Sequence, residues 1–160
     1  MVTISLCMIV KDEEAVLGRC LDSAADIVDE VVVVDTGSSD RTKEIAGQYG
    51  RVLDFTWCED FAAARNASFA QATKDFILWL DADDVIEPEA QSRFLQFKQE
   101  LDETTDVVML PYHTDFNEDG RPTYTYYRER LLRRAAGFRW VGAVHECIAP
   151  RGNIRYGDAA

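Results

Sequence analysis

Residues 76–84 read Phe-Ile-Leu-Trp-Leu-Asp-Ala-Asp-Asp, a short apolar run that stops at a cluster of carboxylates. Residues 31–35 repeat this pattern, with four valines followed by Asp35. A short run that is apolar throughout is expected of a strand buried on both faces, as in parallel sheets covered by helices. We therefore predict that each run is a central strand of a parallel α/β sheet, and that its aspartate begins the loop after the strand.

The first two thirds of the chain keep this rhythm, because short apolar runs alternate with amphipathic helical stretches. Such alternation favours a doubly wound, mostly parallel sheet flanked by helices. Asp12 is predicted to cap the first helix, Gly50 to end the second, and Pro88 to begin the fourth. The expected strands are residues 3–10, 31–34, 52–55, 76–80 and 107–110, and the third helix is expected at residues 61–72.

The rhythm changes after Pro111. Asn-Glu-Asp-Gly at residues 117–120 predicts a turn between two extended aromatic segments. The last third is therefore expected to be a mixed α+β segment. We treat residues 1–160 as one domain, with a ligand-binding part at residues 1–111 and a second part at residues 112–160.

Composition narrows the possible functions. The 160 residues are 47% hydrophobic and 29% charged, and the formal net charge is −12. That sign argues against a nucleic-acid-binding surface, since phosphate backbones select Lys and Arg. It fits a site that gathers carboxylates around a cation, although an acidic surface can also serve solubility alone.

The cysteines and the N-terminus bear on localisation. Four cysteines lie far apart without a C-x-x-C pair, so neither a zinc site nor a disulfide framework is indicated. The chain enters a strand-like segment at once, and no apolar run approaches the roughly 20 residues of a membrane span. We expect a soluble, cytoplasmic protein without a transmembrane segment.

Three acidic segments are expected at one edge of the sheet. They are residues 11–13, 35–40 and 81–84, each of which follows a predicted strand. Open α/β sheets bind ligands at the carboxyl ends of their strands. The alternative is that aspartate is common at loop starts and helix caps, and it explains any one segment more easily than all three.

Asp81 and Asp83 are the sharpest candidates for a metal site. In an extended segment, residues two apart point the same way, so both carboxylates can approach one ligand. Carboxylate oxygens suit Mg²⁺ or Mn²⁺, which leave positions open for phosphate oxygens. Such an ion would neutralise charge developing on a diphosphate leaving group. A solvated acidic loop is the alternative for a lone D-x-D.

The chain resembles the family 2 glycosyltransferases. The resemblance rests on four blocks in the order and spacing of that family, and it covers nearly the whole chain. The blocks are Met8–Glu14, Val34–Asp40, Ala64–Asn66 and Leu80–Asp84. The segment Trp140-Val-Gly-Ala-Val-His-Glu146 is similar to a W-x-G-x-V-H-E block of a bacterial subgroup that includes lipopolysaccharide-core glucosyltransferase-like and tetratricopeptide-repeat glycosyltransferases.

This resemblance implies a GT-A fold and sugar transfer from a nucleotide donor, UDP in the first instance, with inversion. It assigns Asp35 to the base and ribose of the nucleotide, and Arg65 to the neighbourhood of its diphosphate or ribose. Asp81 corresponds to a ribose-side or metal-supporting carboxylate, and Asp83 to the direct metal ligand. Val10, Lys11 and Glu13 correspond to the wall around the base.

An inverting transfer also needs a base for the acceptor hydroxyl. Glu146 is the candidate by its position in the V-H-E block, and His145 could position acceptor or phosphate or bind a metal. A buried structural role for both residues is the alternative. Many GT-A enzymes supply a further metal ligand, often a histidine, from a later strand. Since the chain ends at residue 160, we expect it to be part of a longer protein.

Two other functions stay open at this point. A haloacid-dehalogenase-type phosphatase also carries a D-x-D after an apolar strand, but normally on its opening strand and followed by Gly-Thr. A non-catalytic module that binds a nucleotide sugar or a protein partner is the other. For the glycosyltransferase, the expected partners are a nucleotide-sugar donor and a glycan, lipid-linked or protein acceptor, with no nucleic acid.

Overall fold

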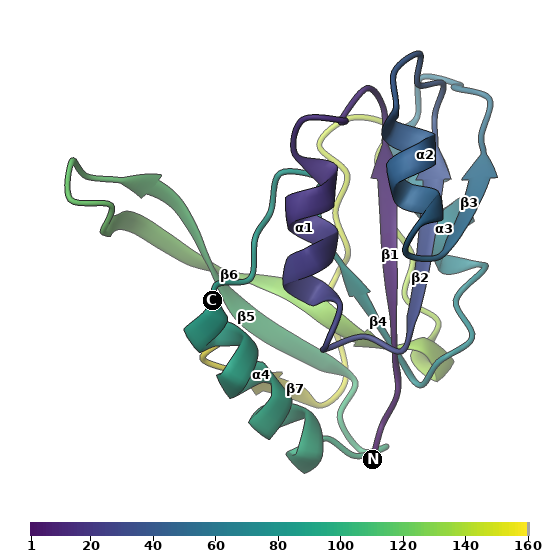
Figure 1. Ribbon diagram of the computed structural model, residues 1–160. Coiled ribbons are helices and arrows are strands. Elements are labelled where there is room, and N and C mark those ends of the chain that lie inside the picture. Colours follow the sequence, from purple (N-terminus) through teal and green to yellow (C-terminus); the bar gives the residue numbers. More distant parts are fainter. Residues whose placement is uncertain (160) are drawn as a thin grey trace.

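A computed structural model describes residues 1–159. Within them the chain forms a seven-stranded sheet in the order β3-β2-β1-β4-β6-β5-β7, flanked by helices (Figure 1). The strands are β1 (Ile4–Val10), β2 (Glu30–Asp35), β3 (Arg51–Asp54), β4 (Phe76–Trp79), β5 (Val107–Phe116), β6 (Pro122–Arg133) and β7 (Ile154–Tyr156). The helices are α1 (Leu17–Ala24), α2 (Thr42–Gly47), α3 (Phe61–Phe69), α4 (Pro88–Glu100) and the 3-10 turn η1 (Arg134–Ala136).

Strands β3, β2, β1 and β4 form the parallel half of the sheet, as the apolar runs predicted. The side chains of Val32, Val33 and Val34 are buried, which agrees with a strand covered on both faces. In register, Val10 at the end of β1 lies opposite Asp35 at the end of β2. The carboxyl ends of these strands therefore meet at one edge.

The core lies in two layers, one on each face of the sheet. Leu6 and Leu78 belong to the layer that includes residues of α1 and α4, while Cys7 and Trp79 belong to the layer that includes residues of α3. Successive residues of a strand point to opposite faces, so neighbours in sequence enter different layers. Figure 1 shows α1 and α3 on opposite sides of the parallel strands.

The second half of the sheet differs from the sequence-based expectation. Strand β6 inserts between β4 and β5 and pairs antiparallel with both, so β5 does not neighbour the parallel half. Strand β5 extends to Phe116, beyond the predicted residue 110. The predicted turn is confirmed, since Gly120 closes the hairpin with a φ of 73°. The far end of this hairpin projects from the sheet (Figure 1).

Two predicted helix signals were wrong. Asp12 has a φ of 53° and accepts a hydrogen bond from the Ser39 amide, while α1 begins at Leu17 without a side-chain cap. Gly50 lies beyond the end of α2, and a Cβ at this position would overlap the backbone of Val31. Close packing against β2, rather than a left-handed conformation, therefore accounts for this glycine.

No helix of residues 1–159 combines the length and the apolar character that crossing a bilayer requires.

Candidate functional site

The predicted convergence of the acidic segments is confirmed. The Asp12 carboxylate accepts a hydrogen bond from the Ser39 amide at 2.7 Å, which ties the loop after β1 to the loop after β2. The pKa of Glu13 is sensitive to the other acids of this edge. Partial burial first, and then the negative charges of Asp83, Asp40, Asp12 and Asp81, raise its pKa above the ordinary value of 4.5. The edge therefore carries a concentration of negative charge.

Asp35 stands at the centre of this edge and is 1% exposed. Its Oδ1 accepts hydrogen bonds from the amides of Gly37 at 2.9 Å and Ser38 at 2.8 Å. Gly37 has a φ of 116°, a conformation that favours glycine and that lets the loop turn back onto the carboxylate. The Oδ2 atom is buried and has no hydrogen-bond partner within the described residues. A buried polar atom without a partner is uncommon and indicates a ligand or solvent position.

The Asp81–Asp84 turn gives each of its three acids a different environment. The Asp84 carboxylate closes the turn, since its Oδ2 accepts the Asp81 amide at 2.9 Å and pairs with Arg130 Nη1 at 2.9 Å. Both side chains of that ion pair are nearly buried, at 8% and 5% exposure. Asp84 is therefore a structural support of the loop. Asp83 is exposed and forms no hydrogen bond or ion pair with the residues that the structure describes.

Asp81 instead faces Arg65. Arg65 Nη2 contacts Asp81 Oδ1 at 2.8 Å, and Arg65 Nε contacts Glu146 Oε1 at 2.6 Å. The guanidinium also lies over the Trp140 and Trp79 rings, 4.7 Å and 5.3 Å from their centroids. One arginine thus joins two acids that are 65 positions apart in the chain, and the distances involved are those of charge-assisted hydrogen bonds.

Glu146 and His145 lie in a loop that folds back on itself. Val141 and Cys147 exchange two backbone hydrogen bonds at its base, of 2.9 Å and 3.0 Å. Gly142 has a φ of 104° and His145 a φ of 55°, a conformation that few histidines adopt. Glu146 is turned inward to Arg65, whereas the His145 side chain is exposed. The loop therefore brings Glu146, and not His145, to the acidic edge.

The remaining predicted residues lie around the same edge. Val10 is buried at the end of β1, and its carbonyl accepts the Thr36 amide at 3.0 Å. Lys11 is exposed directly after it. The Glu13 amide donates to Thr42 Oγ1 at 2.7 Å, which joins this loop to the start of α2.

Arg130 and Asn66 are two contributors to this site that sequence reasoning missed or underrated. Arg130 holds Asp84 and lies 4.0 Å from the centroid of the Trp79 ring. The Asn66 side chain donates to the Trp140 carbonyl and accepts the Trp140 amide, both at 2.9 Å. A single buried arginine in a strand carries no periodic signal. The Ala-Arg-Asn block at residues 64–66 did mark Asn66, but not its partner.

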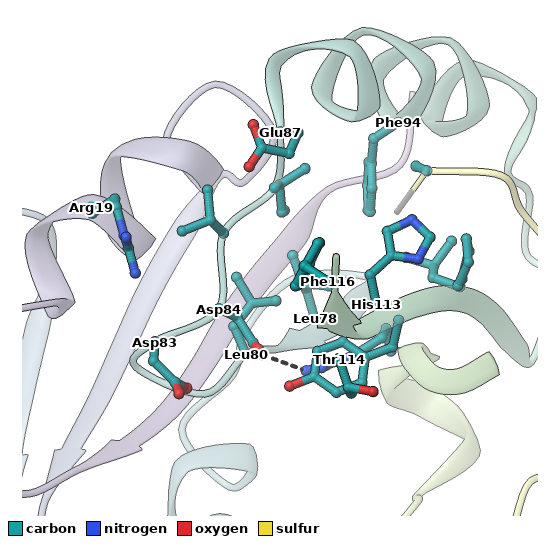
Figure 2. A pocket seen from close by; sticks show the side chains of 17 residues that line it. Arg19, Leu78, Leu80, Asp83, Asp84, Glu87, Phe94, His113, Thr114 and Phe116 are labelled. Atoms are coloured by element: carbon teal, nitrogen blue, oxygen red, sulfur yellow. Dashed lines mark ion pairs between the residues drawn. The ribbon is translucent and has the colours of Figure 1, made fainter. Parts of the chain in front are cut away.

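A pocket of about 440 Å³ lies beside the Asp81–Asp84 turn (Figure 2). In that view Asp83 and Arg19 lie at one side of the pocket, with Phe94 and His113 at the other. Leu78 lines the pocket, whereas its neighbour Trp79 lies in the core layer of the opposite face. The apolar part of the pocket therefore lies on the face of the sheet opposite to Trp79 and Arg65.

The donor set fits a metal ion only in part. Asp83 and the second oxygen of Asp81 are available, but no group of three His, Cys, Asp or Glu side chains within residues 1–159 is arranged to hold an ion. Mg²⁺ and Mn²⁺ are commonly bound through one or two carboxylates together with substrate phosphates. The two aspartates therefore fit an ion that a diphosphate completes, rather than a site formed by the protein alone.

The chain matches glycosyl transferase family 2 over residues 5–155. A TPR repeat-containing protein of Synechococcus elongatus is 40% identical over 149 residues, which cover 92% of this chain and 36% of that protein. The lipopolysaccharide core biosynthesis glycosyltransferase LpsC of Rhizobium meliloti is 26% identical over 162 residues, covering 94% of this chain and 58% of LpsC. The chain thus spans little more than a third of the first relative.

Solved structures agree with this relationship. The structure of S. aureus TarS 1-349 in complex with UDP-GlcNAc has a TM-score of 0.59 and 28% identity, over 76% of this chain and 37% of that one. Glucosyl-3-phosphoglycerate synthase of M. tuberculosis has a TM-score of 0.57 and 25% identity, over 70% and 46%. The chain therefore belongs to glycosyltransferase family 2 and has the GT-A fold, and the phosphatase alternative is set aside.

Proposed function

We propose that this family 2 domain binds a nucleotide-diphosphate sugar, UDP-linked in the first instance, and contributes to the inverting transfer of that sugar to an acceptor hydroxyl. The observation that carries the proposal is the buried, unpartnered Oδ2 of Asp35 at the carboxyl edge of the sheet. A carboxylate oxygen can accept hydrogen bonds from a base N–H or a ribose hydroxyl. The TarS neighbour, which was solved in complex with UDP-GlcNAc, supports the choice of UDP.

Asp83, with Asp81, is the proposed contact to a divalent ion that arrives with the diphosphate. Its support is the exposure of Asp83, which leaves both carboxylate oxygens open to a ligand. When bound, the ion would offset the negative charge of the leaving diphosphate. It would also offset the mutual repulsion of the acids, which together with the larger effect of burial raises the pKa of Glu13. A structure of the M. tuberculosis synthase was solved with Mn²⁺ and UDP, which makes Mn²⁺ the first ion to test.

Glu146 is the proposed base. Inversion requires that the acceptor oxygen attack the anomeric carbon from the face opposite the leaving group, and a carboxylate on that side takes the proton. In support, Glu146 is joined to Asp81 through the single residue Arg65, and is therefore close to the proposed donor site. His145 is proposed as an acceptor contact rather than a base, because its side chain is exposed on the same loop.

Binding of UDP measured by calorimetry, with and without Mn²⁺, tests the proposal. We expect Mn²⁺-dependent binding that Asp83→Ala weakens at least about tenfold, or roughly 1.4 kcal/mol. Asp35→Asn should weaken binding in the presence and in the absence of Mn²⁺. Asp26→Ala is a matched control, since Asp26 is an exposed acid after the end of α1, at the opposite edge of the sheet.

The outcomes separate the parts of the proposal. Binding that Mn²⁺ does not affect, but that Asp35→Asn weakens, would keep the donor site and remove the metal. Failure of the folded protein to bind UDP or GDP would overturn the donor site. If the chain is a non-catalytic binding module, it should bind UDP but should not release UDP from UDP-sugars. Release of UDP that Glu146→Gln abolishes would exclude such a module.

A further inference from the structure

We infer that Arg65 is a positioning residue that fixes the proposed base, Glu146, relative to the donor loop at Asp81. This inference rests on the proposed function. It differs from a direct contact between Arg65 and the diphosphate, which the family resemblance suggests. In the structure the guanidinium is already engaged with both carboxylates.

The geometry supports a rigid link. Arg65 uses two different nitrogen atoms for its two partners, Nε for Glu146 and Nη2 for Asp81. A guanidinium is planar and its N–H directions are fixed, so the position of one carboxylate constrains the position of the other. The side chains of Arg65 and Glu146 are each only 12% exposed, so water screens this contact little.

Neighbouring contacts restrict the guanidinium further. It lies over the rings of Trp140 and Trp79, and these two rings meet edge to face with centroids 4.8 Å apart. The next residue, Asn66, bonds both backbone groups of Trp140 at 2.9 Å. Helix α3 therefore holds the loop of Glu146 in two ways, by the Arg65–Glu146 ion pair and by the pair of hydrogen bonds from the Asn66 side chain to the Trp140 backbone.

The helix also contacts the tip of that loop. The Phe61 amide, at the start of α3, donates to the Ala143 carbonyl at 2.9 Å. Phe61 and Arg65 are four residues apart, so they lie on the same side of the helix. Residues 140–147 are thus attached along one side of α3, and Arg65 is the attachment that continues to the donor loop.

A displacement of a reacting group by about 1 Å can cost on the order of 100-fold in rate. We therefore expect Arg65→Gln to lower the kcat of UDP release from UDP-sugar by about 100-fold. The Kd for UDP with Mn²⁺ should change by less than about threefold. A double variant, Arg65→Gln with Glu146→Gln, should be no slower than Glu146→Gln alone. Arg65 acts through Glu146, so its loss has no further effect once the Glu146 carboxylate is gone.

Arg65→Lys separates geometry from charge. A lysine keeps the positive charge but offers one ammonium group on a flexible stem, so it can engage only one of the two carboxylates. We expect the kcat of Arg65→Lys to reach no more than about one tenth of the wild-type kcat. Arg133→Gln is the control, since Arg133 also pairs with a carboxylate, that of Asp106, and lies opposite Phe76 at the start of β4, whereas the acidic edge follows the end of that strand. It should leave kcat unchanged.

Hydrogen exchange provides a readout that needs no turnover. The Trp140 amide donates to the Asn66 side chain, and the amides of Val141 and Cys147 donate to each other's carbonyls. Arg65→Gln should speed their exchange and leave the β1 amides protected, whereas Arg133→Gln should not affect them.

Two results would overturn the inference. One is a loss of UDP affinity in Arg65→Gln as large as its loss of kcat/KM, which would mean direct donor contact. The other is unchanged exchange at residues 140–147. Absence of UDP binding in the wild type would instead overturn the proposed function, and the exchange result would then decide only whether Arg65 fixes the loop of Glu146.

Discussion

The ion pair between Asp84 and Arg130 gives the sharpest prediction of stability. Both side chains are nearly buried, and the guanidinium lies between the rings of Trp79 and Tyr112, 4.0 Å and 4.6 Å from their centroids. Arg130 also donates to the Trp79 carbonyl at 3.2 Å. Removal of the Asp84 carboxylate would leave this cation buried, with one neutral acceptor and two ring faces.

The cost can be estimated from these contacts. Breaking a buried ion pair by removal of one partner costs about 3–5 kcal/mol, and loss of the hydrogen bond from the Asp81 amide adds about 1 kcal/mol. A domain of this size has a free energy of unfolding of about 5–15 kcal/mol. Asp84→Ala should therefore lower it by roughly 4–6 kcal/mol. Asp83→Ala, at an exposed carboxylate, should change it by less than about 0.5 kcal/mol.

Urea unfolding followed by tryptophan fluorescence measures both variants. With an m-value of about 2 kcal/mol/M, Asp84→Ala should lower the midpoint by about 2–3 M, and Asp83→Ala by no more than about 0.25 M. Arg130→Met combined with Asp84→Asn should cost at least ~1 kcal/mol less than the sum of the single changes, because no unpaired charge then stays buried. Equal midpoints for Asp84→Ala and Asp83→Ala would refute the structural role of Asp84.

Three further predictions concern other parts of the fold. Folding raises the pKa of Glu13 above its ordinary value of 4.5, so its contribution to stability falls as the pH rises from 4.5 through the raised pKa. Glu13→Gln should therefore raise the Tm at pH 7 by roughly 1–2 °C and leave it unchanged at pH 4, which scanning calorimetry can test. Burial raises the pKa of Cys7 and Cys20 to about 12, so Ellman's reagent should titrate only the two exposed thiols in the native protein and all four in denaturant. Asn66→Ala removes both hydrogen bonds to Trp140, and should lower the free energy of unfolding by about 1–3 kcal/mol in urea, with an unchanged m-value.

The acidic edge could be predicted from the sequence because it depends on local features. Each of Val10, Val34 and Leu80 is the last residue of an apolar run. An acid follows Val34 and Leu80 directly, and three acids follow Val10 after Lys11. Parallel strands align their carboxyl ends, so the sequence positions translate into spatial neighbours without knowledge of strand order. The hairpin turn at residues 117–120 could be predicted for the same reason.

The insertion of β6 could not be predicted in this way. Apolar alternation marks a strand but does not say which neighbour it pairs with, and Leu131 and Leu132 are compatible with several positions in a sheet. The helix cap assigned to Asp12 was wrong because a nearby loop, through Ser39, offered its carboxylate another amide. In both cases the deciding contact is remote in sequence.

Long separation also explains why the central contacts of the site were not predicted. Arg65 and Glu146 are 81 residues apart, and the sequence marks each of them only within its own block. The positive charge of Arg65 suggested an anionic partner, and the phosphates of a donor and the carboxylates of the protein satisfy that expectation equally well. Only the fold distinguishes between them.

The Asp81–Asp84 turn shows how one motif can serve several needs. Successive side chains of the turn meet different surroundings: Asp81 reaches Arg65 on the α3 face, Asp83 extends into solvent, and Asp84 turns inward to Arg130. To contact a cation as proposed, Asp83 needs fixed positions on either side of it, and the ion pairs of Asp81 and Asp84 supply them. The Asp83 carboxylate can then stay without an ion-pair partner among the described residues, because the neighbouring residues hold the backbone. The contacts of Asp84 hold the backbone that exposes Asp83, so changes that loosen the Arg130 pair should affect the proposed donor site by moving that backbone.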